Sequence, residues 1–137
     1  MAVQTIIDNA CAQLYYHDDT KIVHHHWMAE LDSVSLRESL TTGNALLRKH
    51  HAEKWLSDNR FIKPHSDEDE HWINTQWLPD AISAGWKYWA LVVPDAEASR
   101  INMVTFVDEF YEKGVRVMVF TNPDQAMEWL IKVDQAH

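Results

Sequence analysis

The sequence predicts an α/β fold in which a mixed β-sheet begins with an antiparallel hairpin and continues with parallel strands, accompanied by about four helices. Three observations predict it. Two short strand-like segments flank a turn near the N-terminus. Two apolar runs, residues 54–57 and 86–93, each lie between segments of helical period, which is typical of interior strands. Short connections and right-handed crossovers then favour parallel pairing of the later strands.

The hairpin is expected from residues 11–17 and 21–29, which flank the turn Asp18-Asp19-Thr20. Residues 1–10 have no clear period, so a loose N-terminal arm and a short edge strand both remain open. Strands exposed at one side of a sheet are templates for pairing with another chain. Seven tryptophans also indicate a surface that prefers a partner. We therefore expect a homodimer.

The first helix begins at Asp32 or Ser33, both good capping residues, and ends near His50 or His51. Its apolar positions recur with the helical period and form one stripe. These positions are Leu36, Leu40, Gly43 and Leu47.

The second helix is predicted from Ser66, which forms a capping box with Asp69, to a stop at Gly85. Two features of it are unusual. Pro79 lies in mid-helix, where it removes a backbone hydrogen bond and costs about 3 kcal/mol unless its surroundings absorb the change. Trp72 projects about 100° or more from the centre of the apolar stripe.

The C-terminal third predicts a helix over residues 98–111, a strand over residues 115–120 and a last helix. That last helix has a well-formed start, because Asn122 is a capping residue, Pro123 suits the first helical position and Gln125 suits the third.

Composition limits the class of protein. The 137 residues fit one domain, residues 1–137, and a formal charge of −9 makes nucleic acid and membrane surfaces poor partners. The sequence has neither a membrane-length apolar run nor the N-terminal pattern of a signal peptide. Cys11 is the one cysteine, which fits a reducing compartment, so we expect a cytoplasmic protein.

Three features of the chain occur together: the hairpin ending in Trp27, the segment Lys54-Trp55-Leu56-x-Asp58-Asn59-Arg60, and the segment Trp72-Ile73-x-x-x-Trp77-x-Pro79-x-Ala81-Ile82-x-x-Gly85. With them, most of the chain, from about Leu14 to Leu130, resembles the STAS domain, the fold of anti-sigma-factor antagonists. More closely it resembles a branch of small bacterial stand-alone STAS-like proteins without assigned function. The resemblance implies the mixed sheet described above and a regulatory or binding role.

Phosphorylation, which switches the antagonist proteins, is not carried over. Their Asp-Ser-Ser-Gly-like turn is missing, and the corresponding loop, residues 58–66, is longer and contains proline. Ser66 is the one serine at the helix start, and the acidic residues 67–70 directly follow it. A phosphate there would gain from the helix dipole but would meet strong like-charge repulsion.

The candidate site follows the central strand, because open α/β sheets bind ligands beyond the carboxyl ends of their strands. Asp58, Asn59 and Arg60 occupy that place, and Trp72 and Trp77 lie on the helix after it. In one interpretation Arg60 and the tryptophans bind a small anion with an apolar body. In the other, Arg60 pairs with Asp58 or the acidic run, and Trp72 anchors the loop of residues 61–65.

Function is therefore expected to be non-enzymatic: a regulatory or binding module that contacts a protein partner or a small ligand through residues 58–77. No catalytic motif, phosphate-binding glycine loop or cofactor fingerprint occurs, so no catalytic residue and no cofactor is assigned. The alternative is a metal-dependent or small-molecule enzyme that uses His24, His26 and Arg60, with His17 as a third ligand across the hairpin. A strand with one solvated face and some half-buried imidazoles is the favoured explanation of that histidine pattern, so no metal site is assigned.

Overall fold

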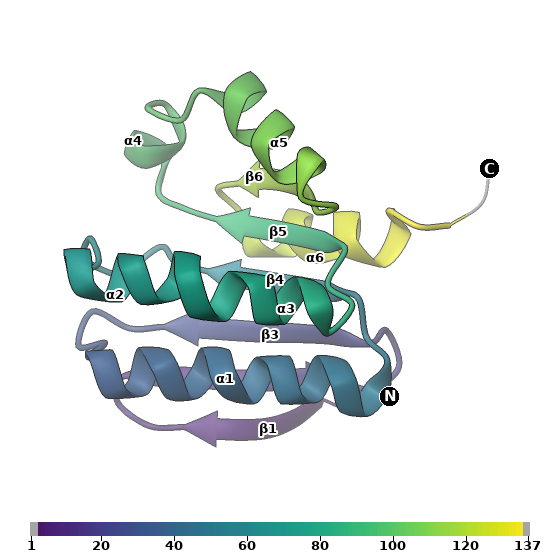
Figure 1. Ribbon diagram of the computed structural model, residues 1–137, viewed down its shortest axis with the longest axis horizontal. Coiled ribbons are helices and arrows are strands. Elements are labelled where there is room, and N and C mark those ends of the chain that lie inside the picture. The colour runs from purple at the N-terminus through teal and green to yellow at the C-terminus, as the bar shows by residue number, and fades with distance from the viewer. Residues whose placement is uncertain (1–2, 136–137) are drawn as a thin grey trace.

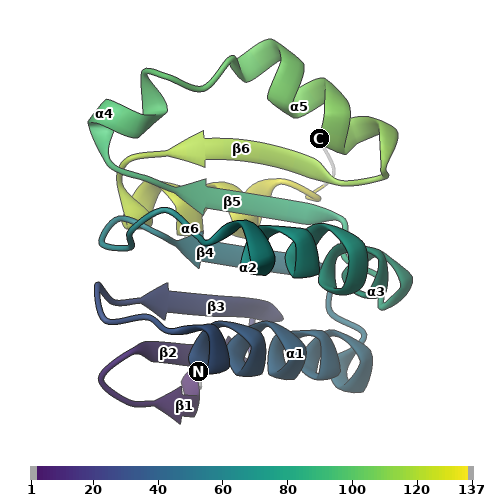
Figure 2. The ribbon, with the colours of Figure 1, turned by 60° about the vertical axis from the view of Figure 1, so that its left-hand side comes forward.

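The computed structural model describes residues 3–135 and contains a six-stranded mixed sheet. The strands lie in the order of the chain, from β1 at one edge to β6 at the other (Figure 2). The pairs β1–β2 and β2–β3 are antiparallel, and all later pairs are parallel. The predicted α/β fold is confirmed. The strands are β1 (Val3–Asp8), β2 (Ala12–His17), β3 (Ile22–Trp27), β4 (Lys54–Asp58), β5 (Tyr88–Val92) and β6 (Arg116–Phe120).

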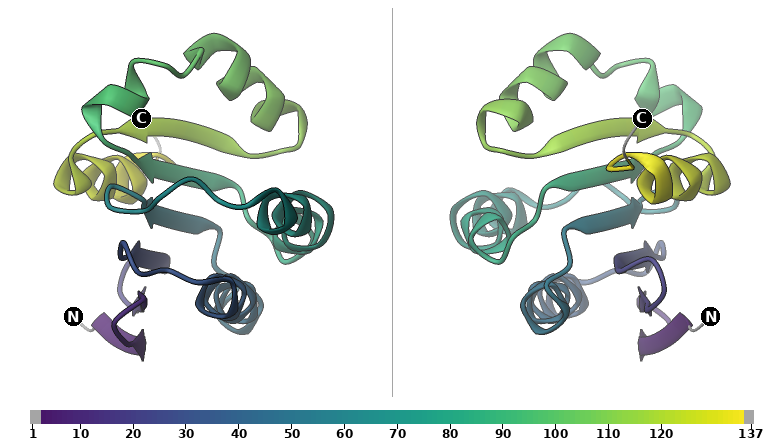
Figure 3. Two further views of the ribbon diagram at one scale, coloured as in Figure 1. Left: turned by 90° about the vertical axis from the view of Figure 1, so that its left-hand side faces the viewer. Right: turned by 90° about the vertical axis from the view of Figure 1, so that its right-hand side faces the viewer.

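The helices connect the parallel strands and follow the last one (Figure 1). Because each crossover moves one strand further in the same direction, right-handed connections place their helices on one face of the sheet. The last helix, α6, packs on the other face against β4, β5 and β6 (Figure 3). The helices are α1 (Ser33–His50), α2 (Asp67–Trp72), the π-helix η1 (Ile73–Trp77), α3 (Leu78–Ser83), α4 (Asp95–Ala98), α5 (Met103–Glu112) and α6 (Pro123–Lys132).

Two apolar cores fill the two faces of the sheet. The larger core lies under α1, the α2–η1–α3 segment and α5, and contains Trp55, Trp77 and Trp86. The smaller core, under α6, includes Leu56 and Leu130. Every residue of β4 is buried, and β4 and β5 are interior strands, as their apolar sequences predict.

The structure refines the prediction in one segment and corrects it in another. Residues 3–8 form an edge strand, which is the second of the two possibilities left open for the N-terminal segment. The helix predicted over residues 98–111 is wrong at its start, because α4 ends at Ala98 and α5 begins at Met103. The side chain of Asn102 accepts a hydrogen bond from the Thr105 N–H, so a second cap restarts the helix.

The helix predicted from Ser66 to Gly85 is present but changes its hydrogen-bond pattern in the middle. Ser66 caps it as expected, through a hydrogen bond from the Asp69 N–H. One π-helical turn, η1, precedes Pro79 directly. Proline within an α-helix lacks a donor and crowds the carbonyl four residues earlier, here that of Thr75. The wider π-turn relieves that crowding and is the structural answer to Pro79.

Gly43 allows α1 to approach the sheet. A Cβ atom at this position would overlap the indole ring of Trp55. We predict that Gly43→Ala lowers the free energy of unfolding by about 1–3 kcal/mol, because overpacking outweighs the gain in helix propensity of about 1 kcal/mol. Urea denaturation measures the change.

The control is Ala45→Gly, at an exposed position of the same helix, which reports helix propensity alone. A stabilised Gly43→Ala protein would show that the close approach of α1 to Trp55 carries no energetic weight.

Candidate functional site

An aromatic cavity of about 300 Å³ opens at the carboxyl ends of β4 and β5, between η1 and α5. Parallel strands end here, which is the usual position of ligand sites in open α/β sheets. Its walls are aromatic and its polar groups few, the composition expected of a small-molecule site. The aromatic lining residues are Trp27, Trp77, Trp86, Trp89, Phe106 and Phe110, and the polar ones are His25, Ser57, Asn59, His65, Glu70 and Asn74.

The cavity tryptophans all use their indole N–H groups inside the protein. The bonds run from Trp27 to Ser39 Oγ (2.9 Å), Trp77 to Leu40 O (3.0 Å), Trp86 to Tyr88 O (3.1 Å) and Trp89 to Ser57 Oγ (2.9 Å). An indole has one donor and no acceptor, so these rings present only apolar surface to the cavity. The walls can therefore pack against a planar apolar body but cannot bond to it.

A hydrogen-bond chain fixes the floor of the cavity. Trp55 Nε1 donates to His25 Nδ1 over 3.0 Å, so that ring nitrogen is the acceptor. His25 then carries its proton on Nε2 and donates it to Asn59 Oδ1 over 2.7 Å. This assigns the Asn59 amide oxygen to His25 and leaves its NH₂ group for the cavity. Within residues 3–135 that NH₂ group has no protein acceptor.

His25 is fully buried, and burial lowers its pKa to about 3 despite the opposing effect of the Asn59 hydrogen bond. The imidazole is therefore neutral at physiological pH. Because both of its nitrogens are hydrogen-bonded, it holds Asn59 in one orientation and is not free to act as a base.

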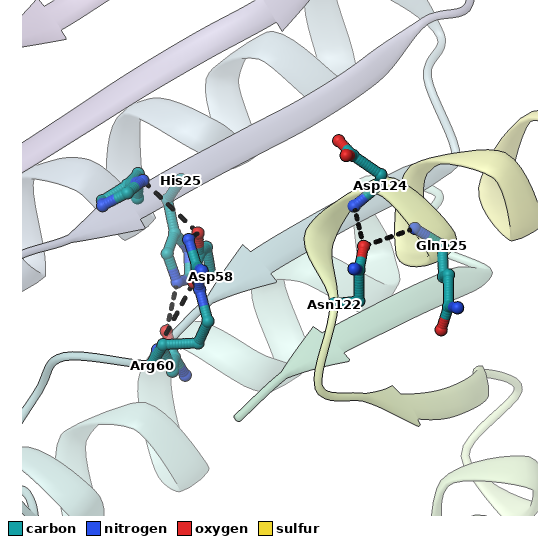
Figure 4. A network of polar contacts seen from close by, with 8 residues as sticks. His25, Asp58, Arg60, Asn122, Asp124 and Gln125 are labelled. Carbon is teal, nitrogen blue, oxygen red and sulfur yellow. Dashed lines mark hydrogen bonds and ion pairs between the residues drawn. The ribbon is translucent and has the colours of Figure 1, made fainter. Parts of the chain in front are cut away.

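Asp58 and Arg60 pair with each other instead of lining the cavity. Arg60 donates from Nε to Asp58 Oδ1 (2.9 Å) and from Nη2 to Asp58 Oδ2 (2.8 Å), beside the Asn122 cap of α6 (Figure 4). Burial opposes ionisation of Asp58, but the bonds from Arg60 and the charge of His26 outweigh it, so its pKa lies below the usual range. This arrangement is the one in which Arg60 holds the loop.

Trp72 lies apart from the cavity as well. The guanidinium of Arg37 covers its ring at 5.1 Å from the centroid, and the ring packs against the larger core. Of the five residues predicted for the site, Asn59 and Trp77 line the cavity, whereas Asp58, Arg60 and Trp72 do not.

The alternation of side chains along β4 explains which predicted residues line the cavity and which do not. Successive side chains of a strand point to opposite faces, so Ser57 and Asn59 share the cavity face while Asp58 points to the other. Residues 58–60 therefore do not form the single cluster predicted from their adjacency, and His25, Ser57 and Trp89 are lining residues that were not predicted. Applying the period of two to residues 54–59 would have found Ser57.

The histidines of the alternative hypothesis lie on the face opposite the cavity. His17 Nε2 and His24 Nδ1 are 3.0 Å apart, and His26 Nδ1 is 3.3 Å from Asp58 Oδ2. Burial, with a further contribution from His17, lowers the pKa of His24 to about 4. Among the described residues, no group of three or more His, Cys, Asp or Glu side chains is placed to hold a metal ion.

A second hollow, of about 700 Å³, adjoins the cavity. It shares Asn59, His65 and Phe106 with the cavity and adds Lys63 and Arg100.

Comparison with known proteins finds no matching family model, no matching curated protein and no matching solved structure. No helix within residues 3–135 has the length and apolar character needed to cross a membrane.

We predict that Arg60→Ala lowers the free energy of unfolding by about 2 kcal/mol, because it leaves the buried Asp58 carboxylate without its bidentate partner. Arg60→Lys keeps the charge but loses the bidentate geometry, so its free energy of unfolding should lie between those of wild type and Arg60→Ala. Chemical denaturation gives the values. Arg116→Ala, at an exposed site on β6, is the matched control and should change stability little. An Arg60→Ala protein as stable as that control would contradict the loop-holding role.

Stability should also fall in acid because of His25. Its imidazole takes up a proton near pH 6.5 in the unfolded chain but near pH 3 in the folded protein, so unfolding is favoured as pH falls through that range. Between pH 6.5 and 5, wild type should lose about 2 kcal/mol more than His25→Gln, which has no proton to take up. Urea titrations at each pH measure the difference, and His71→Gln, at an exposed site on α2, should follow wild type. Parallel curves for wild type and His25→Gln would rule out a neutral buried His25.

Proposed function

We propose that this protein is a non-enzymatic, STAS-like binding module that holds a small molecule with a planar apolar body in the aromatic cavity beneath residues 58–77. The observation that carries the proposal is the cavity itself: six aromatic side chains around a floor with a few oriented polar groups. A protein partner that binds the ligand-bound form would contact the same region, residues 58–77.

The chemistry of the floor supports binding over catalysis. His25 is neutral and bonded at both nitrogens, and the Ser57 oxygen already accepts the Trp89 N–H. Neither group forms the nucleophile–base pair that covalent catalysis requires. The enzyme alternative relies on Arg60, whose guanidinium is bound to Asp58 on the other face.

The walls of the cavity suggest how a partner could distinguish the ligand-bound protein from the free protein. In α5 no residue is fully buried, although Phe106 and Phe110 of this helix line the cavity. Weakly packed elements open most easily, so a ligand that bridges α5 and the π-turn would order the helix. The exposed apolar side chains of α5, Val104 and Tyr111, would then be presented in a fixed arrangement to a partner.

Two further proposals concern assembly and location. The outer edge of β1 has no neighbouring strand in the described part of the chain, which supports pairing with a second copy as a homodimer. The single cysteine supports a cytoplasmic location.

Planar bicyclic compounds test the proposed cavity. Ligands of about ten non-hydrogen atoms at roughly 0.4 kcal/mol per atom should bind with Kd near 1 mM. Coumarin, indole and 2-naphthoate are to be titrated separately by saturation-transfer NMR, and at least one should bind. Asn74→Trp, at an exposed position on the rim, should block the cavity and weaken that binding about tenfold.

The matched control is Gln76→Trp, on the same π-turn but outside the cavity lining, which should bind like wild type. The proposal fails if none of the three compounds binds at millimolar concentration, or if both tryptophan variants bind as wild type does.

A further inference from the structure

We propose that the cavity selects neutral planar molecules carrying a hydrogen-bond acceptor, such as a carbonyl oxygen, and that Asn59 determines this specificity. The inference rests on the proposed function and adds the chemical class of the ligand. It follows from which polar atoms of the cavity are already bonded and which remain available.

Asn59 presents donors because of the hydrogen bonds behind it. Trp55 has only a donor to offer, so His25 Nδ1 must accept and His25 Nε2 must donate. Asn59 therefore turns its oxygen toward His25 and its NH₂ group toward the cavity. The orientation of an asparagine amide is ambiguous by itself, but the bonds from buried Trp55 to buried His25 and from His25 to half-buried Asn59 admit one assignment.

Ser57 presents a donor for a similar reason. Its oxygen accepts the Trp89 N–H with one lone pair, which leaves the hydroxyl proton free to be donated elsewhere, beside one further lone pair. Ser57 and Asn59 are two residues apart on one strand and line the same cavity. Consecutive positions on one face are about 6–7 Å apart, close enough for both to reach the polar end of one small molecule.

The four cavity indoles are committed to protein acceptors and the two phenylalanines have no polar atom, so the walls beside the floor offer the ligand no hydrogen bond. The other polar lining residues, His65, Glu70 and Asn74, lie at more exposed positions than Ser57. A ligand that places a donor against Asn59 would leave both its own N–H and the Asn59 amide unpaired. Buried groups without partners are costly, so the floor discriminates against donors.

Charge argues for a neutral acceptor. The cavity lining contains no lysine or arginine, His25 is uncharged, and Glu70 lies at the rim. A carboxylate would lose its hydration shell without gaining a cation and would approach a like charge. Lys63 and Arg100 line the second hollow but not the cavity.

Three compounds of similar shape test this order of preference: coumarin, a neutral acceptor, indole, a donor, and 2-naphthoate, an anion. Wild type should bind coumarin about fivefold more tightly than indole, the difference expected for one hydrogen bond, and 2-naphthoate most weakly. Coumarin should also shift the Asn59 side-chain NH₂ signals in a ¹H–¹⁵N spectrum. These signals are identified by their loss in Asn59→Asp.

Asn59→Asp should reverse the preference, because a carboxylate still accepts from His25 but offers the cavity acceptors in place of donors. Coumarin should bind about fivefold or more weakly than in wild type, and indole at least as tightly. Gln76→Asp introduces a carboxylate on the same π-turn but outside the cavity lining, and should keep the wild-type preference.

Equal binding of coumarin and indole by wild type, or unmoved Asn59 NH₂ signals on coumarin binding, would overturn the inferred polarity while leaving the proposed function intact. No binding of any compound would overturn both. If Asn59→Asp does not fold, the wild-type preference and the NH₂ signals still decide.

Discussion

The buried indole of Trp55 is the interaction on which the larger core and the cavity both depend. Its ring lies against Gly43, which has no Cβ atom, so α1 can pack close to the sheet at this point. Its edges meet Trp77 of η1 and Trp86 beside β5, with ring centroids 5.3 and 6.3 Å away. Its N–H fixes the tautomer of His25 and, through it, the orientation of Asn59. A residue with no exposure therefore controls which atoms the cavity offers to a ligand.

The π-turn shows how a locally unfavourable sequence can serve the site. Pro79 would disrupt a regular α-helix, and the chain accommodates it by widening the preceding turn. That turn holds Trp77, whose N–H donates to Leu40 O, and places Asn74 on the rim of the cavity. Segments that break local rules and are stabilised by tertiary contacts are often found at functional sites. Pro79 thus shapes one wall of the cavity from outside it.

Sequence patterns predict the fold of this protein much better than they predict its site. Short-range rules predict strands β4 and β5 and the helix caps at Ser66 and Asn122. They also predict the change from antiparallel to parallel pairing. The site is different, because it joins a histidine on β3, a serine on β4 and phenylalanines on α5. Their convergence depends on the register of the sheet, which pairs His25 with Ser57, and on the place where α5 restarts. Neither can be read from periodicity, and α5 began later than its apolar pattern indicated.

The two faces of β3 and β4 divide the polar chemistry of the molecule between them. On the α6 side, the Asp58 carboxylate is held by Arg60 and lies beside His26, so its charge is compensated locally. On the cavity side, His25, Ser57 and Asn59 are neutral; His25 is hydrogen-bonded to Asn59, and Ser57 accepts the Trp89 N–H. The period of two in a strand produces this separation directly, since Asp58 lies between Ser57 and Asn59 in sequence yet faces away from both. A buried ion pair next to an aromatic cavity would raise the cost of desolvating a ligand there. Keeping the pair behind the sheet leaves the floor of the cavity without a charged group, and this arrangement favours recognition by hydrogen bonding over recognition by charge.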